Sequence, residues 1–218
     1  MIIKQLRTWK EIDIITANKK KGRIGMQKYF AVISLALLIF LVLIRAAIMK
    51  KREGIRAFVF GKTDKKDFII LPFALLFFYQ ILANAFGWPK LFGQTVSRFL
   101  FHIDLIGNIG VAFCILGLTV FLISLISFGK SFRVGVDAEK PDKLVTTGIF
   151  AISRNPIYIA FGAELLGLLL IIPTLLSLFY LIAGISLFHR QILIEEAFLK
   201  DYYGKEYEEY RQKVRRYF

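Results

Sequence analysis

"PIYIAFGAELLGLLLIIPTLLSLFYLIAGISLF" runs from Pro156 to Phe188 and contains one charged side chain, Glu164. The stretch is too long for a single membrane crossing, which needs about 20 residues. Pro173 stands near its middle. Because proline removes a helical hydrogen bond and clashes with the preceding turn, we expect two short helices, about Pro156 to Ile172 and Thr174 to Arg190, joined as a hairpin.

Three further apolar runs are long enough to cross a bilayer. They are Tyr29 to Met49, Phe68 to Phe86 and Leu105 to Phe128. The whole chain is 56% apolar with a mean hydropathy of +0.59, which is too high for an ordinary soluble domain. The sequence therefore predicts an all-α integral membrane protein with about five transmembrane helices, of which the last two form the hairpin.

The net charge of the chain is strongly positive, +14 from 30 basic and 16 acidic residues. These charges lie between apolar runs rather than on one soluble face, which favours membrane lipids over nucleic acid as the partner. Most Lys and Arg fall in segments 45–66 and 130–154 and in the C-terminal tail, so these segments are expected on the cytoplasmic side. The basic cluster Lys19 to Arg23 argues against this and leaves the side of the N-terminus open. The single cysteine, Cys114, excludes an internal disulfide and a cysteine-based zinc site, and no metal is expected.

Both ends of the chain carry helical patterns. In the first 25 residues, apolar residues recur at helical spacing among charges, which fits either a helix lying in the interface or a frayed tail. In the tail from Glu195 to Phe218, apolar residues fall at spacings of 4, 3, 4 and 3; they are Tyr203, Tyr207, Tyr210, Val214 and Tyr217. This stripe predicts a cytoplasmic C-terminal helix folded back onto the bundle.

The hairpin is preceded by "TTGIFAISRNPIY", Thr146 to Tyr158. Arg154 and Asn155 come directly before Pro156, a residue favoured in the first turn of a helix. Free backbone N–H groups, the helix dipole and a guanidinium would then meet at one membrane boundary and could bind an anion. The alternative is an arginine that anchors the helix to lipid phosphates.

The hairpin is followed by "HRQILIEE", His189 to Glu196. Two carboxylates at a membrane boundary are costly unless a cation accompanies them, either a ligand or a nearby Lys or Arg. A hairpin would bring Arg154 and Glu195 to the same membrane face. The expected result is a pocket with an anion-binding end and a cation-binding end, which would suit an amino-acid-like zwitterion.

Taken together, "LVTTGIFAISRNPIY", the apolar hairpin and "EEAFLKDYYGKEYEEYRQKV" resemble the isoprenylcysteine carboxyl methyltransferases and the small phospholipid N-methyltransferases. The resemblance covers about Lys130 to Tyr217. It implies methyl transfer from S-adenosylmethionine to a lipophilic acceptor, an isoprenoid-type carboxylate or a phospholipid amine, at the cytoplasmic face. It also implies a division into residues 1–128, with the interfacial segment and three membrane helices, and residues 129–218, which bind the cofactor.

The resemblance assigns roles residue by residue. Its cofactor-binding positions are Leu144, Val145, Phe150, Asn155, Pro156, Tyr158 and Glu195; its catalytic positions are Arg154, Glu195 and Glu196; and its substrate-binding positions are Gln191 and Arg190. Two positions depart from the family pattern. Asn155 replaces a histidine and cannot carry charge. Gln191 replaces the arginine that serves the acceptor carboxylate in the carboxyl methyltransferases, and glutamine is a weaker carboxylate partner.

Other interpretations remain open at this point. The element "YYGKEYEEY" is also similar to the tail of some NADPH-dependent lipid and steroid reductases, and a non-catalytic membrane scaffold is a third possibility. Glu164, at membrane depth, is a functional candidate or a hydrogen-bond donor between helices, the latter favoured, with amide partners at positions 80, 84 or 108. The glycines at 107, 110 and 117 permit close helix contact within or between chains, so the oligomeric state is open.

Overall fold

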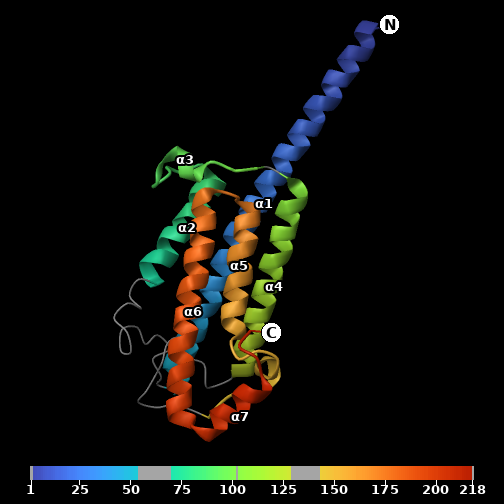
Figure 1. Cartoon of the computed structure of the whole chain (residues 1–218). Coiled ribbons are helices and arrows are strands. Elements are labelled where there is room, and N and C mark those ends of the chain that lie inside the picture. Colours follow the sequence, from blue (N-terminus) through green and yellow to red (C-terminus); the bar gives the residue numbers. More distant parts are fainter. Residues whose placement is uncertain (1, 54–69, 102, 129–142, 218) are drawn as a thin grey trace.

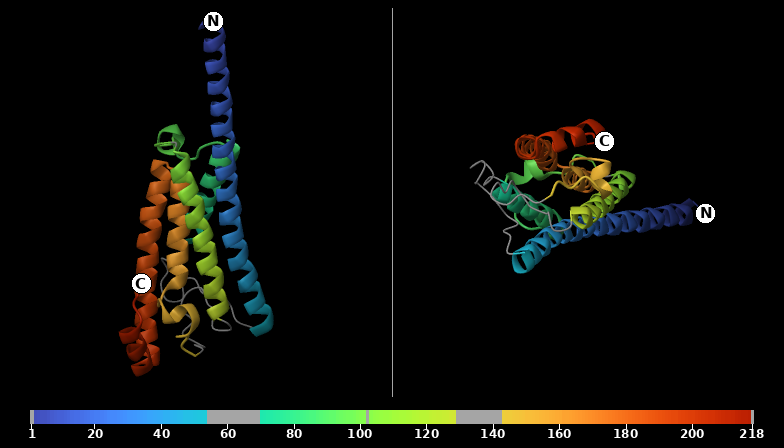
Figure 2. Two further views of the ribbon diagram at one scale, coloured as in Figure 1. Left: turned by 90° about the vertical axis from the view of Figure 1, so that its right-hand side faces the viewer. Right: turned by 90° about the horizontal axis from the view of Figure 1, so that it is seen from below.

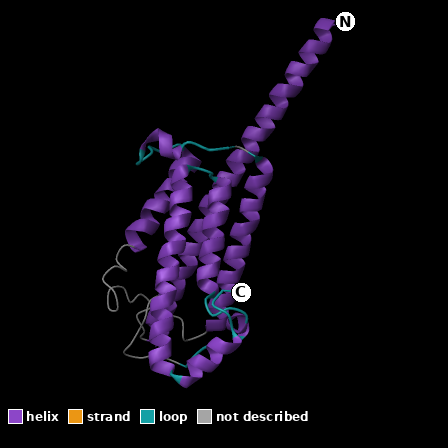
Figure 3. Ribbon diagram, in the orientation of Figure 1, coloured by secondary structure: helices purple, strands orange, loops and turns teal. Residues whose placement is uncertain are grey.

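The structure is a computed structural model that describes residues 2–53, 70–101, 103–128 and 143–217, with side chains from Gly25 onward (Figure 1). Its elements are α1 (Ile2–Glu53), α2 (Ile70–Phe86), α3 (Gly93–Ser97), α4 (Asp104–Phe128), the 3₁₀ helix η3 (Gly148–Ala151), α5 (Pro156–Ile171), α6 (Leu175–Tyr203) and α7 (Lys205–Lys213). All of these elements are helical (Figure 3), and the β pairing in the described part of the chain is one isolated bridge between Phe99 and Thr174.

Five helices form the bundle, and they confirm the predicted all-α membrane fold. Three contain stretches long and apolar enough to cross a membrane: Gly25–Lys51, Asp104–Phe128 and Leu175–Tyr203. The apolar helices Leu71–Phe86 and Pro156–Ile171 are shorter. The chain runs alternately up and down the bundle, so that α1, α4 and α6 run toward the end where α7 lies, and α2 and α5 run away from it (Figures 1 and 2).

The predicted hairpin is present, and hydrogen bonds stabilise its turn. α5 ends at Ile171 and α6 begins at Leu175, so Pro173 lies between them as expected. The side chain of Thr174 caps α6 by accepting a hydrogen bond from the backbone N–H of Ser177 at 3.0 Å. The backbone N–H of Leu100 donates to the carbonyl of Pro173 at 2.7 Å. The segment before α4 therefore fastens the turn to the rest of the bundle.

The C-terminal part differs from the prediction in one respect. α6 does not end near Arg190 but continues to Tyr203, because no helix-breaking residue occurs before Gly204. Gly204 has a φ of +53°, a conformation that side chains disfavour, and it turns the chain into α7. The fold-back therefore begins at Gly204, not at Glu195.

The predicted apolar stripe of the tail is buried along only part of its length. Tyr207, Tyr210 and Val214 form a buried cluster, against which Tyr203 packs. Tyr217 is 37% exposed instead, and its hydroxyl lies 2.6 Å from Nδ1 of His189. The stripe crosses the break at Gly204 and runs past the end of α7, so it does not mark one continuous helix face.

The closest packing in the bundle is between α4 and α5, and it depends on glycine. A Cβ atom added at Gly110 would lie 2.7 Å from the carbonyl oxygen of Gly167, and one added at Gly117 would lie 2.9 Å from the carbonyl oxygen of Ala160. The two backbones therefore touch, as small residues allow in membranes. At Gly110 and Gly117 the close contact is within the chain.

Glu164 joins helices, although not through the partners expected. It is 1% exposed, and its Oε1 accepts a hydrogen bond from the Ser34 hydroxyl of α1 at 2.8 Å. The amide of Asn108 instead accepts from Gln27 at 2.8 Å. The prediction of an amide partner was wrong, because α1 rather than α2 packs beside this turn of α5, and Asn108 of α4 is paired with Gln27 instead.

The N-terminal segment is helical but is not a separate element. α1 runs without interruption from Ile2 to Glu53, and its first part extends beyond the bundle (Figure 2). The orientation was predicted from basic segments of the sequence. Residues 54–69 and 129–142, which contain much of two of these segments, lie outside the described residues. The proposed division at residue 128 falls between α4 and η3, inside this bundle, and stays a prediction.

Candidate functional site

Two clusters from distant parts of the sequence meet at the end of the bundle near α7. α5 has 16 residues and is about 24 Å long, whereas α6 has 29 residues and extends well past the start of α5. Side chains on a helix lean toward its N-terminus. Tyr158 of α5 therefore leans toward the end of the bundle, and Glu195 of the antiparallel α6 leans back into it.

The first group of side chains centres on the carboxylate of Glu195. Tyr158 donates its hydroxyl hydrogen bond to Oε1 of Glu195 at 2.6 Å, and the Gln191 amide donates to the same oxygen at 3.3 Å. The Tyr158 ring packs against the neighbouring rings of Phe161 and Phe188, with centroid distances of 6.4 and 5.9 Å. These contacts give the carboxylate a fixed position at the edge of the apolar hairpin.

The second group centres on the neighbouring carboxylate, Glu196. Its Oε1 lies 3.1 Å from the guanidinium of Arg154 and accepts from the Asn155 amide at 3.2 Å. Its Oε2 is bound by Arg216, from Nε at 3.1 Å and from the terminal nitrogen at 2.8 Å. The hydrogen bond to Glu196 raises the pKa of the Arg216 guanidinium. Two cations thus neutralise one largely buried carboxylate.

The segment after α7 closes over this group as a strap, residues 214–217. Its carbonyl groups accept three hydrogen bonds from the corner before α5: Arg154 N–H to Arg215 at 3.1 Å, the Ser153 hydroxyl to Arg216 at 3.3 Å and the Asn155 amide to Arg216 at 3.2 Å. Arg154 also donates to the carbonyl of Arg211 at 3.3 Å. The strap and the corner therefore form one rigid polar unit.

This arrangement confirms the predicted proximity of the two motifs but changes the expected roles within them. Arg154 was predicted to be the anion-binding end of a pocket, yet its guanidinium is occupied by Glu196 and by the Arg211 carbonyl. For Glu196, the alternative of pairing with nearby cations is what the structure shows. Arg154 and Glu196 thus position the corner, and Glu195 accepts hydrogen bonds from Tyr158 and Gln191.

Arg216 was missed by sequence reasoning. It lies 20 residues after Glu196 along the chain and reaches it only because α7 folds back. The signal that could have found it is electrostatic, since carboxylates at a membrane boundary need cations near them. "RR" at positions 215 and 216 was the remaining unassigned basic pair near the tail.

The other predicted site residues lie around these groups. Leu144 packs against the tyrosine cluster of α7. Phe150 is 4% exposed, stacks edge-to-face on Phe128 at 4.5 Å and accepts the Tyr210 hydroxyl on its carbonyl at 2.7 Å. Pro156 is buried at the first position of α5, while Val145 and Arg190 are partly exposed.

The site keeps polar atoms that the described residues do not satisfy. These buried atoms are Oε1 of Gln191, Nε of Arg154 and the hydroxyl of Tyr207. Burial raises the pKa of Tyr207 to about 12, so its hydroxyl stays protonated at neutral pH. Buried polar atoms in folded proteins are almost always hydrogen-bonded. Three buried atoms without a hydrogen-bond partner around one pair of carboxylates are therefore consistent with a polar ligand that binds them.

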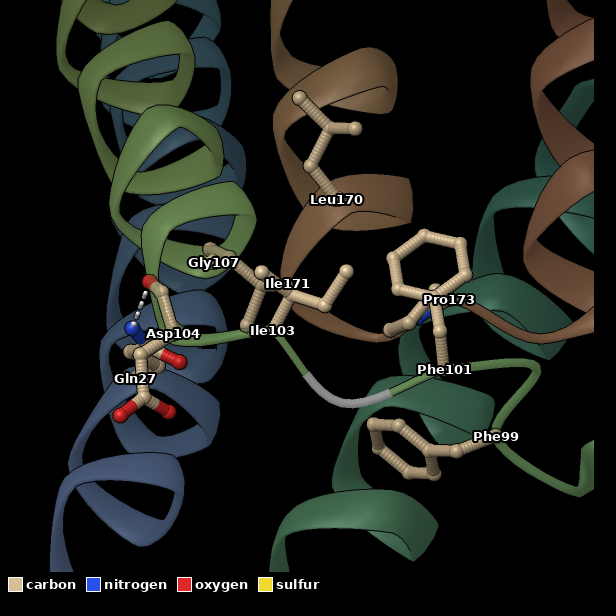
Figure 4. A pocket seen from close by; sticks show the side chains of 9 residues that line it. All are labelled: Gln27, Phe99, Phe101, Ile103, Asp104, Gly107, Leu170, Ile171 and Pro173. Carbon is tan, nitrogen blue, oxygen red and sulfur yellow. Dashed lines mark hydrogen bonds between the residues drawn. The ribbon is translucent and has the colours of Figure 1, made fainter. Parts of the chain in front are cut away.

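A small cavity at the other end of the bundle is not part of this site. It lies where α1, the start of α4 and the hairpin turn meet, and Gln27, Phe99 and Pro173 are among its lining residues (Figure 4). Its volume of about 10 Å³ has room for about one water molecule. A nucleoside-sized ligand therefore cannot occupy it.

Comparison with known proteins gives a consistent set of relatives. The family model described as phospholipid methyltransferase matches residues 106–206. A probable protein-S-isoprenylcysteine O-methyltransferase of Oryza sativa subsp. indica is 30% identical over 155 residues, which cover 69% of this chain and 74% of the relative. A protein-S-isoprenylcysteine O-methyltransferase of Tribolium castaneum is 31% identical over 138 residues, 61% of this chain and 49% of the relative. The chain thus spans about half the length of the Tribolium relative.

A solved structure shares the fold. The structure of the eukaryotic intramembrane Ras methyltransferase, an isoprenylcysteine carboxyl methyltransferase, superimposes with a TM-score of 0.59 at 22% identity. The match covers 88% of this chain and 66% of that one. At this identity the likeness establishes the arrangement of the helices, and it agrees with the predicted membrane fold.

Proposed function

Because the chain belongs to the family of membrane methyltransferases that includes the protein-S-isoprenylcysteine O-methyltransferases, we propose that it transfers a methyl group from S-adenosylmethionine to a lipophilic acceptor. The observation that carries the proposal is the Tyr158–Glu195–Gln191 group beside the Asn155–Glu196 group at one end of the bundle. Of these residues, Asn155, Tyr158 and Glu195 are positions at which the family resemblance expects the cofactor. The NADPH-dependent reductase gains no support from the comparisons.

The donor would supply an electrophilic methyl group on a sulfonium, with a cationic amino group and a carboxylate nearby. Glu195, oriented by Tyr158 and Gln191, is placed to hold a cationic group. Tyr207 offers a protonated hydroxyl and Arg154 offers its Nε–H to acceptor atoms. Leu144, Val145 and Phe150 would then touch the cofactor, as the resemblance implies for these positions.

The residues of the chain do little acid–base chemistry in this proposal, and their main task is placement. A methyl transfer needs the acceptor atom, methyl carbon and sulfur in line at near-contact distance in a water-poor space. The Glu196 ion pairs and the strap hold the corner before α5 in one position relative to α6. An amine acceptor would also have to lose a proton, which a carboxylate of the pair could take.

Two acceptor classes fit the site. The names of the curated relatives favour a thioether-linked isoprenoid carboxylate, and the description of the family model favours a phospholipid. Gln191, in place of an arginine, offers a carboxylate a neutral amide instead of a charged partner. We place the reaction at the cytoplasmic face, because most basic residues flank the end of the bundle that carries the site.

A direct test is to incubate the purified protein, in vesicles, with isotope-labelled S-adenosylmethionine and each acceptor class, and to follow the label by mass spectrometry. We expect label in an isoprenylated cysteine carboxylate or in a phosphatidylethanolamine. Glu195→Gln should lower the rate at least about tenfold, since a hydrogen bond to a charged group contributes about 1.5–3 kcal/mol. Glu209→Gln, on the exposed face of α7, is the matched control and should keep the rate. Label in neither acceptor class, with the protein folded, would contradict the proposal.

A further inference from the structure

Two lysines at the end of the bundle opposite the candidate site lie close together. Lys28 belongs to α1, and Lys90 follows α2 in the connection to α3. Both are partly buried. Burial, and after it the positive charge of Lys28, lowers the pKa of Lys90. The ring of Tyr29, next to Lys28, lies 5.6 Å from the ring of Phe86 at the end of α2, so the two lysines belong to neighbouring elements. Their like charges repel in a partly desolvated place, which is unfavourable unless an anion joins them.

Among the described residues, Lys28 has no carboxylate partner. Its ammonium lies 4.6 Å from the centroid of the Phe99 ring, and within the described part of the chain it has no hydrogen bond or ion pair. Asp104, the acidic residue at the start of α4, lies beside Gln27, whose amide donates to the Asp104 carbonyl at 3.3 Å (Figure 4). The contact with the ring attracts the cation but leaves all three N–H groups of the ammonium available.

Lys90 is held in place and retains a free donor. Its ammonium donates to the carbonyl of Ala83 at 3.0 Å and to the side-chain oxygen of Asn84 at 2.9 Å. These bonds fix the ammonium at the C-terminal end of α2. An ammonium has three donors, so one N–H of Lys90 remains for a ligand. Lys90 is thus preorganised, and Lys28 supplies the second contact.

The surroundings of the two lysines suit a lipid. Tyr29, Phe86 and Trp88 form a row of rings with centroid distances of 5.6 and 5.8 Å. All three are about half exposed, at 48%, 50% and 47%. Aromatic rings of this kind mark the level of the lipid headgroups. The apolar surface of α1 continues from them toward the membrane centre, with Ile33 63% exposed.

We propose that Lys28 and Lys90 bind the phosphate of an anionic phospholipid in the leaflet opposite the candidate reaction site. The phosphate would bridge the two ammonium groups, and the glycerol and acyl chains would lie on the aromatic row. The role is separate from methyl transfer, because the two lysines and the carboxylates occupy opposite ends of the bundle.

The test is lipid retention by the detergent-purified full chain, measured by native mass spectrometry after exposure to phosphatidylglycerol or phosphatidylcholine. The wild type should retain phosphatidylglycerol preferentially. Lys28→Gln is the clean variant, because it breaks no hydrogen bond among the described residues, and it should weaken phosphatidylglycerol retention about fivefold. Lys205→Gln, whose side chain is 92% exposed at the other end, is the control and should retain lipid like the wild type.

Three results would overturn the proposal. One is equal retention of the two lipids by the wild type, and another is unchanged phosphatidylglycerol retention in Lys28→Gln. The third concerns the source of the phosphate: if inorganic phosphate displaces the lipid at millimolar concentration in a Lys28-dependent way, the ligand is a free anion rather than a lipid. The methyl-transfer assay serves as the fold control, because Lys28→Gln should leave its rate unchanged.

Discussion

Glutamine in place of Glu196 should lower the free energy of unfolding by about 3 kcal/mol, the lower end of the range for removing one partner from a buried ion pair. The substitution keeps the volume of the side chain but removes the charge that faces Arg154 and Arg216. The Arg154 side chain is only 8% exposed and would be left buried without a counter-charge, whereas Arg216 is 35% exposed and regains water. Thermal unfolding in detergent, followed by intrinsic fluorescence, measures the loss.

The control for this prediction is Glu209→Gln. Its carboxylate is 57% exposed and lies 4.0 Å from Lys205, so its removal should change stability by less than about 0.5 kcal/mol. A double variant, Arg154→Gln with Glu196→Gln, should lose less stability than the sum of the two single variants, because the residues share one network. Equal stability of Glu196→Gln and the wild type would show that the ion pairs do not hold the corner.

Valine in place of Gly167 should be the most disruptive single change in the membrane part, with a loss of about 3 kcal/mol or more. A Cβ atom at this position would lie 2.6 Å from the Cys114 sulfur and 2.7 Å from the carbonyl oxygen of Gly110. The Gly110 contact is with backbone, so no side-chain rotation can relieve it. α4 and α5 would have to separate, which also displaces the corner at the start of α5.

Gly162→Val is the matched control on the same helix. A Cβ atom at Gly162 meets nothing within 4 Å, and valine is a better helix former than glycine, so this change should be neutral or slightly stabilising. The comparison uses the midpoint of thermal unfolding and the yield of monodisperse protein. Similar behaviour of the two variants would mean that α4 and α5 are less tightly packed than the structure shows.

The membrane architecture could be predicted because its signals are local. Apolar runs of crossing length marked the helices, and Pro173 marked the hairpin turn. The hairpin in turn predicted that Arg154 and Glu195 would share one face, since antiparallel neighbours joined by a short turn bring their far ends together. The 2.6 Å hydrogen bond from Tyr158 to Glu195 shows that the two ends of the hairpin do meet.

The features that could not be predicted depend on turns between helices and on which helices are neighbours. Gly204 is one of 16 glycines, and the sequence does not give the direction in which its positive φ turns the chain after α6. Without that bend, Arg216 has no reason to reach Glu196. The identity of the partner of Glu164 also depended on helix order around the bundle, which apolar periodicity does not encode in helices that are apolar on every side.

The most direct measurement for the central claim is calorimetric titration of the purified protein with S-adenosylhomocysteine, with NADPH run in parallel. If Glu195 and the corner before α5 hold the methyl donor, S-adenosylhomocysteine binds, NADPH does not, and Glu195→Gln weakens binding at least about tenfold while Glu209→Gln does not. Binding of NADPH instead, or S-adenosylhomocysteine affinity that is the same with and without the Glu195 carboxylate, would contradict the assignment of this site.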